Sequence, residues 1–235
     1  MNNMFILSHA PYLNDYHITS ESVYHFFDKI VCINLISRQD RLKYVKNIFK
    51  KLNIPVDFFI TKKHKLGGKF GCFYSKYSVV KESYNSGANT LLMFEDDVKP
   101  TRKYDVKKIN ECIDFMKINK DWCIFYLGRG FPLSSNMIKD YLFRNNNNNI
   151  YQGFFGYNHS LVFSRRGMKL YLDKCEEIFN DKKKINNFIN SNIYSDIIIG
   201  KLFSKTSYYH HYTLFCQNQQ FDTDNNYGSW LNNDK

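Results

Sequence analysis

Short apolar runs alternate along the chain with segments whose apolar residues recur every three or four positions. A short continuous apolar run predicts a buried strand, and the three- to four-residue spacing predicts an amphipathic helix. We therefore expect strands within 29–35, 55–60, 91–94, 122–128, 151–164 and 207–215. We expect helices that include 42–52, 73–84, 106–116, 168–179 and 195–203, with Ser195 as the N-cap of the last.

The alternation of strands and helices predicts the class of fold. It favours an α/β sandwich with a largely parallel central sheet flanked by helices. The 235 residues suffice for one such domain with a large core, so we expect a single domain over 1–235. Between the elements we expect a glycine-rich basic loop at 62–71, a surface excursion at 132–149 and a polar tail beyond 217.

The composition narrows the class of protein more than its chemistry. A net charge of +11 indicates an anionic partner, and nucleic acid, an acidic surface or a nucleotide phosphate would each fit. The six cysteines lack the C-x-x-C spacing of zinc sites and are typical of reduced thiols. No apolar run approaches the roughly 18 residues of a membrane helix, and the start lacks a secretory pattern. We expect a soluble protein of the cytoplasm, of a host cell if the source is viral.

Three consecutive carboxylates, Glu95, Asp96 and Asp97, follow the apolar run 91–94. Ligands of an α/β sheet bind beyond the carboxyl ends of its strands, and carboxylate oxygens suit Mg²⁺ or Mn²⁺. Because side chains alternate along a strand, Glu95 and Asp97 are expected to share a side. We interpret the acids as a divalent metal site with Asp97 as principal ligand; the alternative is a solvated acidic loop.

Two further stretches could bind an anionic ligand. Arg38 and Arg41 follow the first expected strand, where their planar donor groups would suit a diphosphate, although a basic first helical turn explains them equally. In "KLGGKFGCFYSK", Gly67, Gly68 and Gly71 could let the backbone approach a ligand. The spacing does not match a P-loop, and a flexible turn is the alternative.

The last third of the chain holds a further candidate acid. Asp196 is expected in the first turn of a helix, where the helix dipole alone would explain it. His210 and His211 are expected on opposite faces of a strand, so they would not bind one metal. Asp222 and Asp224 lie in the polar tail and could complete a metal site or be surface residues.

Taken in order, these segments resemble glycosyltransferase family 25, which includes bacterial lipooligosaccharide galactosyltransferases and procollagen galactosyltransferases. "VCINLISRQDR" is similar to the family's opening strand, "GCFYSKYSVVKES" to its Gly-Cys helix and "LLMFEDDV" to its Glu-Asp-Asp strand. "WCIFYLG", "GYNHSLVFSRRGMKLYL" and "YSDIIIG" follow in the family's order. The resemblance covers 29–225.

The resemblance implies a GT-A-type fold, a UDP-sugar donor, usually UDP-galactose, and bound Mn²⁺ or Mg²⁺. It implies inverting transfer of a hexose, galactose above all, to a hydroxyl of a collagen-like hydroxylysine or of a glycan such as lipopolysaccharide. Asp196 would be the catalytic base. The metal would be held by Asp97, Glu95 and Asp222. Contacts to the donor would come from Asn34, Leu35, Arg38, Arg41, Lys69, Gly71, Glu95 and Asp96.

The chain departs from the family's pattern at Lys76, where the family has His, and at Asn158 and His159, where it has apolar residues. Two functions of other classes compete with the glycosyltransferase. One is a basic nucleic-acid-binding protein, although no known binding motif is present. The other is a two-metal nuclease that uses the same carboxylates. Whether the protein is a monomer or a homo-oligomer stays open.

Overall fold

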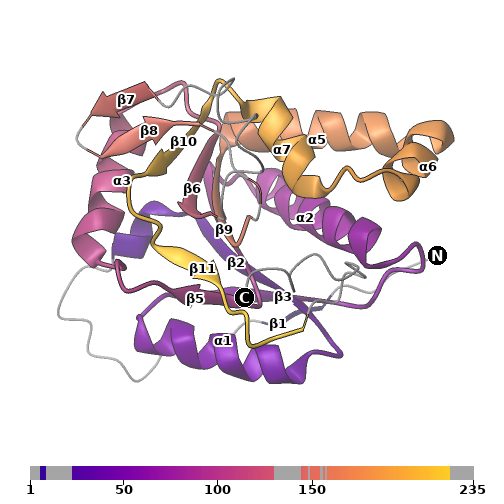
Figure 1. Ribbon diagram of the computed structural model, residues 1–235, viewed down its shortest axis with the longest axis horizontal. Helices are drawn as coiled ribbons and strands as arrows, with labels where there is room; N and C mark the ends of the chain where they lie inside the picture. Colours follow the sequence, from indigo (N-terminus) through magenta and orange to yellow (C-terminus); the bar gives the residue numbers. More distant parts are fainter. Residues whose placement is uncertain are drawn as a thin grey trace, which may run out of the picture.

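A computed structural model of the protein describes residues 6–8, 23–129, 144–147, 149–153, 156 and 158–222. One β-sheet runs through the centre of the molecule (Figure 1). Across the sheet, the strands are β1 (Ile6–Ser8), β3 (Asp57–Thr61), β2 (Lys29–Leu35), β4 (Thr90–Glu95), β9 (Ser160–Ser164), β6 (Ile124–Gly128), β10 (Ser207–His210), β8 (Ile150–Gln152) and β7 (Arg144–Asn147). β11 (Phe215–Gln217) pairs with β6 and with β5 (Val98–Pro100).

The central part of this sheet is mostly parallel. β3, β2 and β4 are parallel neighbours, and so are β6 and β10. β9 lies between β4 and β6 and is antiparallel to both, so β4 and β6 point the same way. The remaining pairings, at the edges, are antiparallel apart from that of β11 with β6. The predicted α/β class with a mostly parallel central sheet is confirmed.

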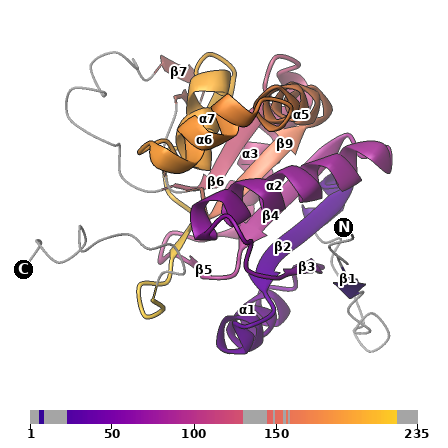
Figure 2. The same cartoon turned by 90° about the vertical axis from the view of Figure 1, so that its right-hand side faces the viewer.

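Helices cover both faces of the sheet (Figure 2). One face packs against η1 (Val23–Phe26), α1 (Gln39–Lys51) and α3 (Val106–Ile118). The other packs against α2 (Gly68–Asn85), α5 (Arg165–Phe179), α6 (Lys182–Asn190) and α7 (Ser195–Phe203). The alternation of side chains along β4 joins the two cores: Leu91 and Met93 enter one, and Leu92 and Phe94 enter the other. This two-sided burial explains why the strand is a continuous apolar run.

Three local predictions need correction. The expected loop at 62–71 ends early, because α2 already begins at Gly68 and includes Gly71. Ser195 is not the N-cap of α7: Tyr194 holds that position, without a side-chain capping bond, and Ser195 is the first helical residue. The late apolar run divides into β10 and β11. The buried His210 is the last residue of β10, and the exposed His211 lies beyond it, so the two histidines are not on one strand.

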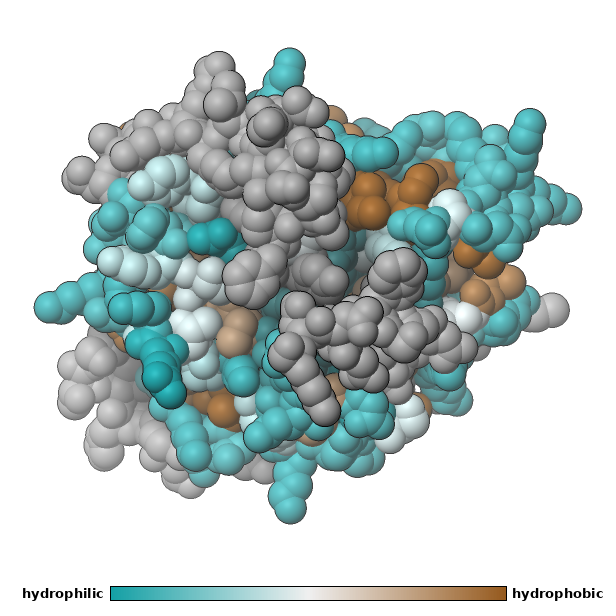
Figure 3. Space-filling view, viewed as in Figure 1, coloured by the Kyte–Doolittle hydropathy of each residue, from teal (hydrophilic) through white to brown (hydrophobic). Residues whose placement is uncertain are grey.

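On the face shown in Figure 3, the described residues are mainly hydrophilic, and hydrophobic residues gather around α6, α7 and the start of α2. Leu66, two residues before α2, and Ile193, between α6 and α7, are exposed large hydrophobic residues. Within the part of the chain that the structure describes, no helix combines the length and the apolar character needed to cross a membrane.

Candidate active site

The three consecutive acids lie where β4 reaches the edge of the sheet. β4 is buried from Thr90 to Phe94 and ends at Glu95, and Asp96 and Asp97 form the turn into β5. β2 runs parallel to β4 and ends beside it, with Ile33 opposite Glu95. Ligands of α/β folds bind at this carboxyl edge, so the acids have the position that the sequence predicts.

Asp96 is the anchor of a buried ion pair. Its Oδ1 lies 2.9 Å from Arg41 Nη1, and its Oδ2 accepts a hydrogen bond of 2.7 Å from Asn34 Nδ2. All three residues are buried. Burial raises the pKa of Asp96 to about 6, although Arg41 and Asn34 favour its charged form. Asn34, Arg41 and Asp96 therefore join β2, α1 and the end of β4, and their contact with a donor stays a prediction.

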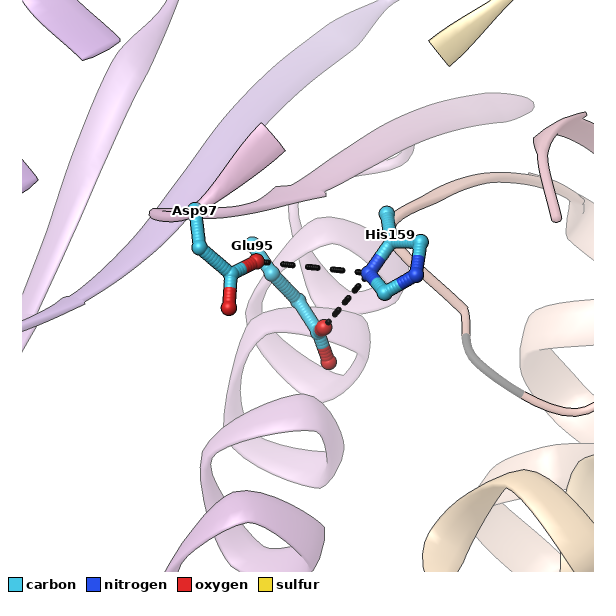
Figure 4. Close-up of side chains that lie close together, drawn as sticks. All are labelled: Glu95, Asp97 and His159. Atoms are coloured by element: carbon cyan, nitrogen blue, oxygen red, sulfur yellow. Dashed lines mark ion pairs between the residues drawn. The ribbon is translucent and has the colours of Figure 1, made fainter. Parts of the chain in front are cut away.

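Glu95 and Asp97 converge instead on His159, the residue just before β9 (Figure 4). His159 Nδ1 lies 3.5 Å from Glu95 Oε2 and 4.0 Å from Asp97 Oδ1. The antiparallel register between β4 and β9 places the histidine there, because the Glu95 amide donates to the His159 carbonyl at 3.2 Å. The expectation that Glu95 and Asp97 share a side is confirmed.

The pKa values of all three groups are shifted from their usual values. Burial would raise the pKa of Glu95, but Lys76 and His159 outweigh it and hold that pKa at about 2. Burial and the charge of Glu95 raise the pKa of Asp97. Burial would lower the pKa of His159, but the two carboxylates raise it. The cluster thus combines two carboxylates with a histidine whose pKa is shifted toward the cationic form by these neighbours.

The donor set fits a divalent metal ion. One ligand atom from each of Glu95, Asp97 and His159 lies within 4.8 Å of the other two. Ligands about 2.1 Å from an octahedral ion are separated by about 3 Å in cis and about 4.2 Å in trans, so small side-chain movements suffice. Asp97 Oδ1 is also buried and accepts no hydrogen bond from any described group. A buried carboxylate oxygen that accepts no hydrogen bond fits the role of a metal ligand, because a bound ion would satisfy it.

Two residues from helices connect this cluster to Asp196. Lys76 of α2 is 1% exposed, and its Nζ lies 2.9 Å from Glu95 Oε1 and 3.2 Å from Asp196 Oδ1. Asp196 lies in the first turn of α7, as predicted. Ser195 Oγ accepts from Lys76 Nζ at 3.3 Å and is 3.2 Å from Asp196 Oδ1. Asp196, the predicted catalytic base, and Glu95, a candidate metal ligand, therefore contact the same ammonium group of Lys76.

Arg38 and Arg41 differ in their surroundings. Arg38 pairs with Asp40, Nη2 to Oδ2 at 2.9 Å, where the aspartate side chain is 52% exposed. The carbonyl of Asp222 accepts from both arginines, and the Phe221 ring lies against both guanidinium groups. The segment after β11 thus contacts both arginine side chains at the edge of the site. Their role as donor-binding residues stays a prediction.

The proposed third metal ligand, Asp222, is placed by its backbone. Asp222 is exposed, and its carbonyl oxygen accepts hydrogen bonds from Arg38 and Arg41. Among the described residues, the group of ligand atoms close enough to hold a metal consists of Glu95, Asp97 and His159, so His159 takes the place expected for Asp222. From the same segment, Gln217 Nε2 donates to Asp97 Oδ2 at 3.0 Å. Coordination by Asp222 stays a prediction, and Asp224 lies outside the described residues.

Lys69, Gly71 and Leu35 were expected to contact the donor. Lys69 Nζ donates to the carbonyls of Phe188, Ile189 and Ser191 at the end of α6, where a cation also complements the helix dipole. A Cβ on Gly71 would lie 3.1 Å from His64 Cβ, so this glycine allows close packing. Leu35 is half-buried at the end of β2. Their contacts with a donor stay predictions.

The sequence missed His159 as a metal-ligand candidate and Lys76 as the partner of two acids. His159 is 64 positions from Glu95 in the chain, and only the pairing of β9 with β4 brings the two together. The signal that could have found both was their departure from the family's pattern.

No family model matches the chain. A stretch of 62 residues is 36% identical to mouse (Mus musculus) procollagen galactosyltransferase 2 and covers 26% of this chain and 10% of that protein. The chain therefore spans about a tenth of the length of the curated relative it matches.

Two solved structures are similar to most of the chain. The glycosyltransferase GlyE of Streptococcus pneumoniae matches 86% of this chain and 56% of its own, with 9% identity and a TM-score of 0.45. A glycosyltransferase involved in the glycosylation of the major capsid of PBCV-1 matches 83% and 94%, with 7% identity and a TM-score of 0.40. These are likenesses of fold at low identity, and an activity for this chain is a proposal.

Proposed function

We propose that the protein is a metal-dependent, inverting glycosyltransferase with a GT-A-type fold. It would transfer a hexose, galactose, from a UDP-sugar to a hydroxyl group. The observation that carries the proposal is the cluster of Glu95, Asp97 and His159, of which the last two are buried, at the carboxyl edge of the parallel strands. The local identity to a procollagen galactosyltransferase supports the class of reaction and the sugar.

The donor atoms favour Mn²⁺ over Mg²⁺. Carboxylates suit both ions, but imidazole nitrogen suits a transition metal, and His159 supplies one. When bound, the ion would offset the negative charge that develops on the leaving diphosphate. Glu95, Asp97 and His159 would hold it, and among the described residues this is the group of acidic and histidine side chains close enough to do so. One such group matches a transferase better than a two-metal nuclease.

The remaining roles belong to side chains around the cluster. The acceptor oxygen would attack the anomeric carbon, the bond from that carbon to the diphosphate oxygen would break, and its electron pair would leave with UDP. Asp196 would accept the proton of the acceptor hydroxyl as the general base. Its side chain is 22% exposed, so an acceptor could reach it, and Lys76 fixes its position beside the metal ligands. Arg38 would contribute positive charge to the donor side.

The acceptor would be a collagen-like hydroxylysine or a glycan hydroxyl, the two classes that the resemblance implies. The exposed hydrophobic residues Leu66 and Ile193 lie in the chain just before α2 and α7, the helices that carry Lys76 and Asp196.

The proposal is tested by a donor screen. UDP-galactose, UDP-glucose, UDP-N-acetylglucosamine and GDP-mannose are incubated with the protein, with hydroxylysine or a simple sugar as acceptor, and nucleotide release is measured. We expect UDP release from a UDP-hexose with Mn²⁺ and none with EDTA. Asp97→Asn should be inactive, whereas Asp114→Asn, an exposed acid on α3, should be active. Equal turnover in EDTA would contradict metal dependence. If none of the donors releases its nucleotide, the proposed function is contradicted.

A further inference from the structure

Lys76 is an ammonium group buried within a cluster of acids. It lies in the middle of α2 and is 1% exposed. Its Nζ has three oxygen partners: Glu95 Oε1 at 2.9 Å, Asp196 Oδ1 at 3.2 Å and Ser195 Oγ at 3.3 Å. An ammonium has three donors, so its hydrogen-bonding capacity is filled. Without this set of partners a buried lysine would be strongly unfavourable.

Glu95 lies between Lys76 and His159. Its Oε1 faces Lys76, while its Oε2 faces His159 Nδ1 at 3.5 Å. The oxygen that would bind a metal is therefore on the same carboxylate that Lys76 already neutralises. A divalent ion bound by Glu95, Asp97 and His159 would lie only a few ångströms beyond the ammonium, with the glutamate carboxylate between them.

We propose that Lys76 is an internal counter-ion of the carboxylate site, which competes with the divalent ion for Glu95 and thereby sets its affinity. The inference rests on the metal site of the proposed function and deepens it. Before metal binds, the ammonium balances the charge of Glu95 and Asp196. After metal binds, the ammonium repels the ion. Lys76 would therefore keep the metal-free protein folded and weaken metal binding.

The alternative is that Lys76 only positions Glu95 for coordination. The two roles predict opposite effects of removing the charge. If positioning dominates, loss of the ammonium weakens metal binding. If charge competition dominates, loss of the ammonium strengthens metal binding. The Coulomb energy favours charge competition, because the repulsion between a unit charge and a divalent ion a few ångströms away changes the affinity more than tenfold, even at an effective dielectric constant of about 20.

The test measures the affinity for Mn²⁺ alone by isothermal titration. Lys76→Met keeps the length of the side chain and removes its charge, and we expect it to bind Mn²⁺ at least about tenfold more tightly than the wild type. Lys76→Arg keeps the charge and should not bind more tightly than the wild type. The matched control is Lys81→Met, which removes an exposed charge from the same helix and should leave the affinity unchanged.

A second pair of proteins covers the case in which Lys76→Met does not fold. Asp196→Asn is compared with Lys76→Met/Asp196→Asn. Because the double variant loses the Asp196 carboxylate together with the ammonium, Glu95 does not face a second carboxylate without the Lys76 charge between them. The double variant should also bind Mn²⁺ at least about tenfold more tightly than its single parent.

The outcomes separate this inference from the proposed function. Tighter binding in the charge-removing variants supports the counter-ion. Equal or weaker binding in them, with measurable binding by the wild type, overturns the counter-ion and leaves the metal site in place. If no variant and no wild-type protein binds Mn²⁺, the metal site of the proposed function is wrong and the counter-ion is overturned with it.

Discussion

Arg41 Nη1 and Asp96 Oδ1 lie 2.9 Å apart in a buried ion pair, 55 positions apart in the sequence. The pair ties the first turns of α1 to the end of β4, directly behind the Glu95–Asp97–His159 cluster. Of three acids that look equivalent in the sequence, Asp96 therefore makes the closest contact with Arg41. Glu95 and Asp97 face His159, and Arg41 Nη1 also lies 3.4 Å from Asp97 Oδ2.

Loss of Arg41 should destabilise the fold rather than act first on the donor. Arg41→Met leaves Asp96 buried without its cationic partner, which typically costs about 3–5 kcal/mol of the free energy of unfolding. Urea denaturation measures the change. Arg166→Met, which removes an ion pair whose two side chains are 60% and 85% exposed, is the control and should cost about 0–1 kcal/mol.

Arg41→Met/Asp96→Asn should recover much of that loss, because the buried carboxylate is removed with its partner. If Arg41→Met is as stable as Arg166→Met, the ion pair does not have the structural role assigned to it.

His159 should decide which metal is bound. His159→Gln removes the imidazole nitrogen, and we expect the affinity for Mn²⁺ to fall at least about 10–100-fold, with a smaller loss for Mg²⁺. Titration without nucleotide measures both. His210→Gln is the matched control, because His210 is also buried but lies on β10 and pairs with Glu111 of α3. An unchanged Mn²⁺ affinity in His159→Gln would remove the histidine from the site.

Asp196 should act on the chemical step. Asp196→Asn should lower kcat by about 10²–10⁴-fold, as loss of a general base does, while UDP still binds in the presence of Mn²⁺. The structural alternative is that Asp196 supports α7 through the helix dipole and Lys76. Measuring kcat and Tm together separates the two roles. A variant that melts lower but turns over normally would show that Asp196 is structural.

Arg38 should act on donor binding. Its guanidinium group lies at the edge of the site and pairs with a half-exposed aspartate, so it could exchange that partner for a diphosphate. Arg38→Ala should raise the donor KM more than it lowers kcat, because the contact would be similar in the ground and transition states. Arg102→Ala, an exposed arginine between β5 and α3, is the control. The same donor KM in both variants would contradict a role for Arg38.

The sequence predicted those parts of the fold whose burial is periodic. β2 has the expected bounds, and α1 and α3 contain the expected apolar faces. In each case the pattern of apolar residues depends only on the geometry of that one strand or helix. The antiparallel direction of β9 could not be predicted, since it depends on which strand it joins. α6 was missed because its nine residues are mostly polar and only Phe188 is buried.

The site divides in the same way. Glu95 and Asp97 could be placed from the alternation of side chains at the end of one strand. The partner of Asp96, the approach of His159 and the burial of Lys76 each depend on tertiary contacts between distant segments. Local sequence patterns carry no information on such contacts. Asn34 and Lys69, which were predicted to contact a donor, consequently have structural partners that the sequence did not indicate.

The central claim is that Glu95, Asp97 and His159 hold a divalent ion that binds the nucleotide diphosphate. The most direct measurement is the Kd of UDP, by isothermal titration, for the wild type and Asp97→Asn, each with Mn²⁺ and with EDTA. We predict tight UDP binding by the wild type only with Mn²⁺, and weak binding by folded Asp97→Asn in both conditions, while Asp114→Asn behaves as the wild type. Equal UDP affinity of the wild type and Asp97→Asn in Mn²⁺ would contradict the account.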